Sequence, residues 1–335
     1  MNRTLIIAEA GVNHNGNVEI AKELCKAAKS AGADAVKFQT WKTEEIITKH
    51  VAQAGYQAEN TKCVESQYDM LKRLELSYEQ FADIKKYCDE LGIMFLSTAD
   101  EKDSLDFLVS LNIPYLKVGS GDIGNISFLR YVGSKKKPVI LSTGMSNLGM
   151  IELSVNALKQ GGAKEIILLH CTTNYPCPYC EVNLNAMNTL KSAFQFPVGY
   201  SDHTVGIEVA VAAVAQGATV IEKHFTLDKK MPGPDHLAST EPQEFALMVK
   251  AIRNIETALG NGIKAPSESE IEISKVVIKR IVAKHFIPKG KVITEEDICV
   301  KRNDLGVPAY FWDSVIGLVS QRDYKTDEAI EVVVR

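Results

Sequence analysis

The sequence of 335 residues lacks several features that would place it in a special class of protein. No apolar run is long enough to cross a bilayer. The first residues, MNRTLIIAEAG, reach the charged Glu9 too early for a secretory signal peptide. There is no excess of basic residues, because 38 lysines and arginines stand against 42 acidic residues. We therefore expect a cytoplasmic protein with neither a nucleic-acid partner nor a membrane partner.

Cysteine is also scarce, and its seven scattered copies make an odd number that argues against a disulfide framework. Two of them, Cys177 and Cys180, form a C-x-x-C pair in TTNYPCPYCEVNL. A redox-active pair of the thioredoxin type lies at the start of a helix early in a βαβ unit, whereas this pair lies late in the chain between prolines. A structural zinc ion would need two further ligands nearby. We expect a loop that tolerates two thiols, with redox control of a neighbouring site as the alternative.

What the sequence does contain is a regular alternation of short apolar runs and amphipathic stretches. The runs of strand length are residues 5–10, 34–40, 93–98, 115–120, 138–144, 165–172, 197–203 and 220–226. Strands that alternate with helices predict parallel pairing through right-handed crossovers. Eight such units over about 260 residues match the size of a (β/α)8 TIM barrel. The alternative, an open doubly wound sheet, is less favoured because no Gly-rich dinucleotide motif follows the first run.

The C-terminal part has a different pattern. Residues 263–279 are polar and are typical of a linker, and residues 280–335 contain short strand-like runs around a Pro-Lys-Gly turn. We therefore predict an α/β chain with a TIM-barrel catalytic domain at 1–262, a linker at 263–279 and a small domain at 280–335. A module this short is marginally stable alone, so we expect it to dock on a barrel, either its own or that of a partner chain.

Polar and charged residues gather where the predicted strands end, which is where TIM-barrel enzymes place their chemistry. Because side chains alternate along a strand, many of these residues share the inward face. They are Glu9, Lys37, Gln39, Thr98, Lys117, Ser120, Ser142, His170, Thr172, Ser201, His203, Glu222 and His224. Unpaired buried charge costs several kcal/mol per ion. The cluster therefore predicts an active site, with an ion-paired network that merely plugs the barrel mouth as the alternative.

Two chemical subsets stand out in this cluster. Lys37 and Lys117, together with nearby hydroxyl groups, predict a site for a phosphate or carboxylate anion. His203 and His224 end neighbouring strands and could hold a divalent metal ion with open positions for water or substrate. The alternative for each histidine is a satisfied residue of the core.

Seven motifs, taken in order, resemble those of one known family. They are AEAGVNHNG (8–16), KFQT (37–40), KVGSGD (117–122), LSTGM (141–145), SDHT (201–204), EKHFTLD (222–228) and PGPDH (232–236). Together they resemble the sialic acid synthase family, and the C-terminal segment resembles its small antifreeze-like (SAF) domain. The resemblance implies condensation of phosphoenolpyruvate with an N-acetylated hexosamine to a nine-carbon 2-keto acid. It also implies a divalent metal, manganese or magnesium, and a domain-swapped homodimer in which the small domain of one chain covers the barrel mouth of the other.

The resemblance also implies roles for individual residues. The metal would be held by His203 and His224. Phosphoenolpyruvate would be bound by Lys37, Thr98, Lys117, Ser120, Ser142, Asn174 and Ser201. The sugar would be contacted by Glu9, Gln39, Asp122, Tyr175 and Asp235, and Arg302 would reach it from the partner chain. The catalytic candidates are Lys37 and Lys117 and the carboxylates Glu9 and Asp122, with Glu222 as an outsider.

Three departures from the family pattern concern the sugar pocket. Asp122 stands where many bacterial relatives have Glu, Asn303 rather than Pro follows Arg302, and STAD (97–100) replaces the more usual STPFD. We therefore expect an altered sugar pocket and an uncertain loop path around Arg302.

The main prediction for the reaction is formation of N-acetylneuraminate from N-acetylmannosamine, with loss of phosphate by C–O cleavage. The first alternative is legionaminate formation from 2,4-diacetamido-2,4,6-trideoxymannose, since PGPDHLAS (232–239) favours these two products over pseudaminate. A second alternative is another metal-dependent barrel enzyme, either an aldolase or a different phosphoenolpyruvate-condensing enzyme. A third is a sugar-binding protein without catalysis, against which the intact polar set at the strand ends argues.

Overall fold

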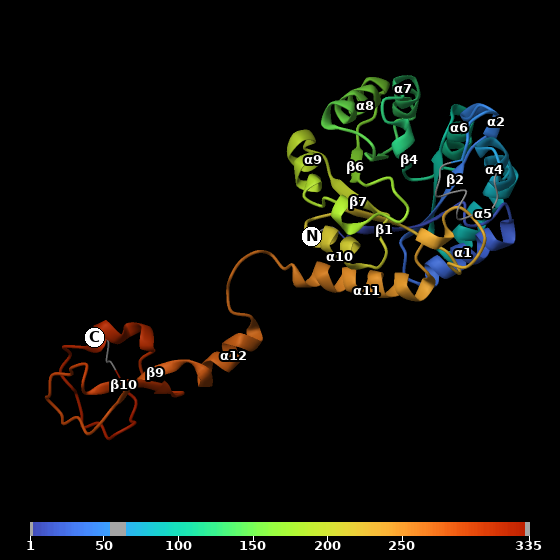
Figure 1. Cartoon of the computed structure of the whole chain (residues 1–335). Coiled ribbons are helices and arrows are strands. Elements are labelled where there is room, and N and C mark those ends of the chain that lie inside the picture. The colour runs from blue at the N-terminus through green and yellow to red at the C-terminus, as the bar shows by residue number, and fades with distance from the viewer. Residues whose placement is uncertain (1–2, 54–64, 332–335) are drawn as a thin grey trace. The chain divides into compact units, whose positions relative to one another are not determined.

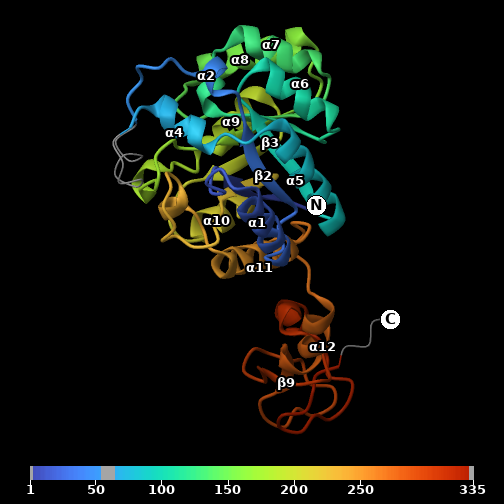
Figure 2. The ribbon, with the colours of Figure 1, turned by 90° about the vertical axis from the view of Figure 1, so that its right-hand side faces the viewer.

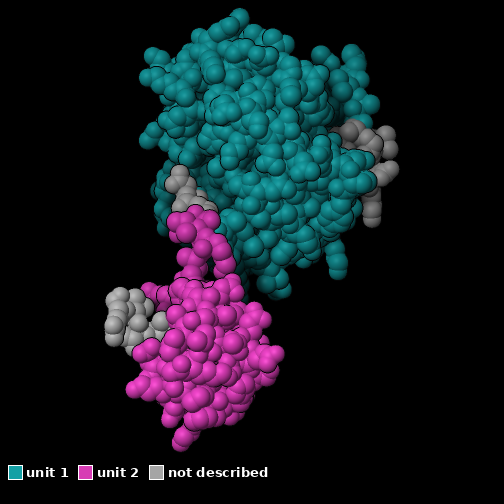
Figure 3. All heavy atoms as spheres, turned by 90° about the vertical axis from the view of Figure 1, so that its left-hand side faces the viewer, with its two compact units in different colours: residues 1–260 teal, residues 261–335 magenta. Residues whose placement is uncertain are grey.

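The structure, a computed structural model, describes residues 3–53 and 65–331. The chain divides into two compact units, residues 1–260 and 261–335, which Figure 3 colours separately. The segment predicted as a linker, 263–279, falls within the second unit.

The first unit is a closed barrel of eight parallel strands arranged in sequence order (Figure 1). The strands are β1 (Leu5–Gly11), β2 (Ala35–Thr40), β3 (Met94–Ala99), β4 (Leu116–Val118), β5 (Val139–Ser142), β6 (Ile166–His170), β7 (Val198–Asp202) and β8 (Val220–His224). Each predicted apolar run overlaps one of these strands. The predicted TIM barrel is therefore confirmed.

Helices surround this barrel, as the two ribbon views in Figures 1 and 2 show. They are α1 (Val18–Ser30), α2 (Thr43–Ile46), α4 (Gln67–Leu74), α5 (Tyr78–Leu91), α6 (Lys102–Ser110), α7 (Ile126–Ser134), α8 (Leu148–Gly161), α9 (Ala186–Phe194), α10 (Glu208–Ala215) and α11 (Pro242–Ala258). Local signals fix their ends: the Asn17 side chain accepts hydrogen bonds from the first turn of α1, and Gly92 ends α5 in the left-handed region.

The strands bury side chains on both faces. Outward residues such as Ile6, Val36 and Phe38 pack with the helices into the main apolar core. Inward residues form a second, smaller cluster of Ile7, Ala35, Leu96, Ile140, Leu169 and Val220. This inner cluster closes the half of the barrel nearer the amino ends of the strands. Two residues further along, the same inward faces carry the polar side chains of the candidate site.

The second unit has its own small core. Strands β9 (Lys279–Ala283) and β10 (Ile298–Arg302) pair antiparallel, and the short elements η4 (Ala309–Phe311) and α13 (Trp312–Val315) follow. Buried residues including Ile281, Ile298 and Tyr324 form its apolar cluster. Helix α12 (Glu268–Val277) occupies most of the predicted linker and begins with a capping box at Ser267. The polar composition of this stretch therefore belongs to an exposed helix.

Within the described ranges, none of the helices has both the length and the apolar character required for a membrane span. The six described cysteines are free thiols, and Cys63 lies outside the described residues.

Candidate active site

The carboxyl-terminal end of the barrel contains a hollow of about 190 Å³, here called the barrel hollow. Every strand of the barrel or the loop after it contributes to its wall. It is lined by Glu9, Lys37, Gln39, Thr98, Asp100, Lys117, Gly119, Ser120, Gly121, Ser142, Met145, Cys171, Thr173, Tyr175, Ser201, His203, Glu222 and His224. The hollow is therefore the place where the sequence-predicted residues can act together.

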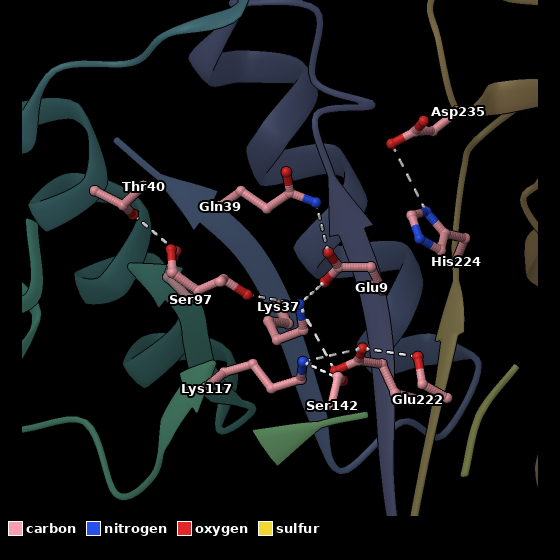
Figure 4. Close-up of polar contacts among 12 residues, drawn as sticks. Glu9, Lys37, Gln39, Thr40, Ser97, Lys117, Ser142, Glu222, His224 and Asp235 are labelled. Carbon is pink, nitrogen blue, oxygen red and sulfur yellow. Dashed lines mark hydrogen bonds and ion pairs between the residues drawn. The ribbon is translucent and has the colours of Figure 1, made fainter. Parts of the chain in front are cut away.

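Two buried lysines form the floor of this hollow. Lys37 on β2 makes an ion pair of 2.7 Å with Glu9 (Figure 4). It also donates a hydrogen bond of 3.1 Å to Thr98. Lys117 on β4 donates a hydrogen bond of 2.7 Å to the hydroxyl of Ser142. The lysine side chains are 3% exposed, so both cations sit in a region of low dielectric where they attract anions strongly.

Glu222 on β8 links the two lysines. Its carboxylate lies 3.6 Å from the Lys37 ammonium and 3.7 Å from that of Lys117 (Figure 4). It also accepts a hydrogen bond of 3.1 Å from Ser201. Two lysines and two glutamates thus form one buried ion network. The sequence placed Glu222 on the right face but assigned it only a marginal catalytic role. The plug alternative requires the buried charges to be paired with one another, and these four residues meet that requirement.

The network shifts the affinity of its members for protons. Burial would by itself raise the pKa of Glu222, but the two lysines outweigh it and hold this pKa at about 2. Burial raises the pKa of Glu9 above its usual value despite the neighbouring Lys37. Burial likewise lowers the pKa of Lys117, whereas Glu222 and Glu9 outweigh burial and raise the pKa of Lys37. Glu222 is thus held as the anion of the pair, and Glu9 is the carboxylate better able to take up a proton.

The two histidines predicted to bind a metal lie side by side, with ring centres 5.5 Å apart. The Nδ1 atom of His203 lies 2.6 Å from the carbonyl oxygen of Thr172, so this nitrogen carries the hydrogen and leaves Nε2 as a lone-pair donor. The Nδ1 atom of His224 is buried without a hydrogen-bond partner among the described residues and lies 3.9 Å from a carboxylate oxygen of Asp235. Burial lowers the pKa of both rings, which keeps them in the neutral form that binds metals.

These features fit a metal ion held by two imidazoles. In the described part of the chain, no three His, Cys, Asp or Glu residues are gathered closely enough to form a fuller set of ligands. The remaining positions around an ion here would fall to water and substrate, which is the arrangement of a catalytic rather than a structural metal. Imidazole donors also favour a transition metal over magnesium.

The predicted sugar contacts are only partly brought together. Gln39 donates a hydrogen bond of 3.0 Å to Glu9, and the ring of Tyr175 lies 4.2 Å from that of His203. Asp235 stands beside His224, and burial raises its pKa to about 7 (Figure 4). Asp122 does not line the barrel hollow, and its carboxylate accepts a hydrogen bond from Asn125. Arg302 lies in the second unit at the exposed end of β10.

The loop after β6 differs most from the prediction. Asn174 is exposed, donates to Glu181 and lines the neighbouring hollow rather than the barrel hollow. Its neighbour Thr173 instead lines the barrel hollow, and no hydrogen-bond partner for its buried hydroxyl is found in the part of the chain that the structure describes. Gly144 permits this arrangement, because a Cβ there would come within 2.3 Å of that hydroxyl. Thr173 was missed because a loop has no periodicity that tells which side chain points inward.

The C-x-x-C pair lies in the same loop. Cys177 is buried and its backbone N–H donates to the carbonyl oxygen of His203, whereas Cys180 is exposed. The helical structure at this pair is a single turn of 3-10 helix, Tyr179–Glu181, which includes Cys180. The pair therefore does not open an α-helix as a thioredoxin-type dithiol does.

Comparison with known proteins gives a consistent result over the whole chain. Residues 24–264 match the NeuB family and residues 280–331 match the SAF domain. An N,N'-diacetyllegionaminic acid synthase from Campylobacter jejuni is 47% identical over 98% of this chain and 99% of its own. A synthase of the same name from Legionella pneumophila is also 47% identical, over 93% of this chain and 89% of its own.

A solved structure agrees with this match. The crystal structure of an N-acetylneuraminic acid (sialic acid) synthetase from Leptospira borgpetersenii, in complex with citrate, superimposes with a TM-score of 0.72. It is 36% identical and covers 82% of this chain and 93% of the other. With the closed barrel, the ion network at its mouth and the matched C-terminal unit, these likenesses confirm the resemblance to sialic acid synthases: the chain belongs to the NeuB family and carries a C-terminal SAF domain.

Proposed function

We propose that this chain is an N,N'-diacetyllegionaminate synthase, which condenses phosphoenolpyruvate with 2,4-diacetamido-2,4,6-trideoxymannose and water and releases phosphate. The observation that carries the reaction class is the pair of buried lysines, Lys37 and Lys117, facing one hollow beside two carboxylates. The choice of sugar is supported by the two relatives of that name at 47% identity, against 36% for the N-acetylneuraminic acid synthetase. N-acetylmannosamine, the acceptor in the main prediction from the sequence, becomes the second candidate.

In this proposal the floor of the barrel hollow holds phosphoenolpyruvate. The carboxylate and phosphate of this substrate need cations and hydroxyl donors, which Lys37, Lys117, Thr98 and Ser142 provide. The buried hydroxyl of Thr173, which has no hydrogen-bond partner within residues 3–53 and 65–331, is a further donor on the same wall. Substrate oxygens would take over hydrogen bonds that the lysines now make to Thr98 and Ser142. The floor therefore orients the enol carbons toward the open side of the hollow.

The chemistry then follows from the substrates. C3 of phosphoenolpyruvate attacks the aldehyde carbon of the open-chain sugar, a C–C bond forms as the C=O π bond breaks, and the aldehyde oxygen takes up a proton from water. Positive charge develops at C2, where Glu222 and Glu9 supply compensating negative charge. Water adds to C2 and gives its proton to a carboxylate, for which Glu9 is suited by its raised pKa. The C–O bond to the phosphate then breaks, which leaves the 2-keto acid and inorganic phosphate.

We assign the metal site to His203 and His224, with manganese favoured over magnesium by the imidazole donors. A divalent ion bound there would act as a Lewis acid for the sugar aldehyde. The ring of Tyr175 lies against that of His203, tilted by 40°, and thereby restricts the space in which that aldehyde can lie.

Two broader expectations belong to the same proposal. The enzyme works as a homodimer in which Arg302 of one chain reaches the sugar bound by the other. It works in the cytoplasm, where phosphoenolpyruvate is made. Light scattering of the purified protein tests the first, and a mass of one chain at micromolar concentration would contradict it.

The test of the proposed function is phosphate release from phosphoenolpyruvate with manganese, supplied with either sugar. The 2,4-diacetamido sugar should give a kcat/KM about tenfold or more above that of N-acetylmannosamine. A site that binds a particular hydrogen-bond donor of its substrate rejects a sugar that lacks this donor. EDTA should abolish release with both sugars. An ¹⁸O label in the bridging oxygen should appear in phosphate. A higher kcat/KM for N-acetylmannosamine would reverse the choice of sugar, and no release with either would refute the reaction class.

A further inference from the structure

One wall residue of the barrel hollow has no assigned role. Asp100 directly follows β3, and its backbone N–H donates to the carbonyl oxygen of Thr40, which continues the strand ladder by one residue. The alternation along β3 places Asp100 on the same inward face as Thr98. Both residues line the hollow. Asp100 therefore stands one inward position beyond the hydroxyl that Lys37 contacts, on the open side of the lysine floor.

The carboxylate of Asp100 makes no hydrogen bond and no ion pair with any residue in the described part of the chain. An acidic residue before a helix often serves as its cap, but here that role belongs to the next residue. Glu101 accepts hydrogen bonds from the backbone of Asp103 and Ser104 at the start of α6. The fold thus gives Asp100 no structural work, although the residue is half-buried against a polar hollow.

Charge decides which substrate can face this residue. Burial, and then the nearby carboxylate of Asp122 behind the wall, raise the pKa of Asp100 to about 7. The wall around Asp100 is therefore acidic. A phosphate or carboxylate oxygen there would meet like charge, whereas the lysine floor offers the opposite charge. A neutral sugar has no such conflict. Its hydroxyl and acetamido N–H groups are donors, and an ionised carboxylate offers only acceptors.

We propose that Asp100 is a specificity-determining residue for the acceptor sugar and accepts a hydrogen bond from a hydroxyl or acetamido N–H group of that sugar. The assignment rests on the proposed function, since it supposes that the sugar occupies the same hollow. It also gives a physical meaning to Asp100 of the STAD motif, whose carboxylate is a hydrogen-bond acceptor on the wall of the hollow.

Steady-state kinetics of two variants test the assignment. Asp100→Asn removes the charge, Asp100→Ala removes the acceptor, and both should raise KM for the sugar, by about tenfold and up to about a hundredfold respectively. KM for phosphoenolpyruvate should stay unchanged or fall. The matched control is Asp103→Asn, the same change at an exposed carboxylate that pairs with Lys42 outside the hollow. This control should leave both KM values unchanged.

A sugar analogue makes the test specific for contact. The penalty of Asp100→Ala should disappear with the one deoxy or N-methylated analogue that lacks the donor, while it persists with the others. A purely structural role would give the same penalty with every analogue. The assignment is overturned if both variants keep the sugar KM within about twofold of the unchanged enzyme, or if only the phosphoenolpyruvate KM rises.

Failure of the proposed function gives a different result. If the unchanged enzyme releases no phosphate with either sugar, saturation-transfer NMR in the presence of phosphoenolpyruvate measures sugar binding directly. A signal with the unchanged enzyme that Asp100→Ala loses supports the role of Asp100 in a binding site that is not this synthase. Equal signals from the two proteins, or no signal from either, overturn it.

Discussion

The interior of the barrel has two halves that the same strands build two residues apart. Toward the amino ends, Ile7, Leu96 and Ile140 form an apolar cluster. Toward the carboxyl ends, the next inward residues are Glu9, Thr98 and Ser142, which line the barrel hollow. A single step of the strand alternation thus separates a packed core from an ion network. The comparison teaches that this barrel gains its stability and performs its chemistry with different residues of the same strands.

The two halves follow different energetic rules. Burial of an apolar side chain stabilises the fold by about 1.5–3 kcal/mol without any particular partner. A buried charge instead depends on its partners, because loss of one leaves the other uncompensated. Lys37 illustrates this dependence, since it is paired with both Glu9 and Glu222.

The largest effect is therefore expected for Lys37→Met. Glu9 would lose its cation, so the free energy of unfolding should fall by about 3–5 kcal/mol. Turnover should fall by at least about 10²–10³-fold, because a donor to the substrate oxygens is lost as well. Unfolding in urea is followed by the fluorescence of Trp41 in a Trp312→Phe background, which leaves one tryptophan, in the first unit. Phosphate release measures turnover.

A second substitution separates the two roles of Lys37. In Lys37→Met with Glu9→Gln, the carboxylate that lost its partner is neutral, so most of the lost stability should return. Turnover should stay low. Recovery of both stability and turnover would support the plug alternative, in which the network only fills the barrel mouth.

A substitution in the apolar half should reduce turnover less than Lys37→Met does. Leu169→Ala leaves a cavity in the fully buried inner cluster and should lower the free energy of unfolding by about 2–5 kcal/mol. The folded protein should retain kcat/KM within about tenfold, because no polar contact to the substrates is removed. Urea unfolding and phosphate release at low temperature check this. A loss of turnover as large as that of Lys37→Met would contradict the division into two halves.

The sequence alone predicted those site residues whose positions follow from the alternation of side chains along a strand. The alternation along the strands brought Glu9, Lys37, Lys117, His203 and His224 to one face, and the structure places all five around one hollow. Their expected chemistry also follows from residue type alone. The partners within the hollow do not, because an ion pair such as that of Lys37 with Glu222 depends on how two strands are registered across the barrel.

The side chains of loops and the helix at the start of the second unit were harder to predict from the sequence. Asn174 and Thr173 are adjacent, and only the path of the loop after β6 tells that Thr173 lines the hollow. Asp100 belongs to the STAD motif that departs from the family pattern, but only the structure shows that its carboxylate has no partner among the described residues. Helix α12 was missed because its polar, exposed sequence resembles a linker.

The smallest effect concerns the contribution of Asp100 to the free energy of unfolding. The pKa of Asp100 is raised to about 7, so the folded state binds this proton more tightly than the unfolded chain. Stability contributed by the protonated form is therefore present at low pH and is lost as pH rises from about 4 to about 7. Asp100→Asn does not ionise and should be more stable than the unchanged protein by about 1–3 kcal/mol at pH 8, with little difference at pH 4. Urea unfolding of both proteins at the two pH values, again followed by Trp41, measures this. A variant less stable at pH 8 would mean that the carboxylate has a structural partner, and its sugar effects would then need a structural explanation.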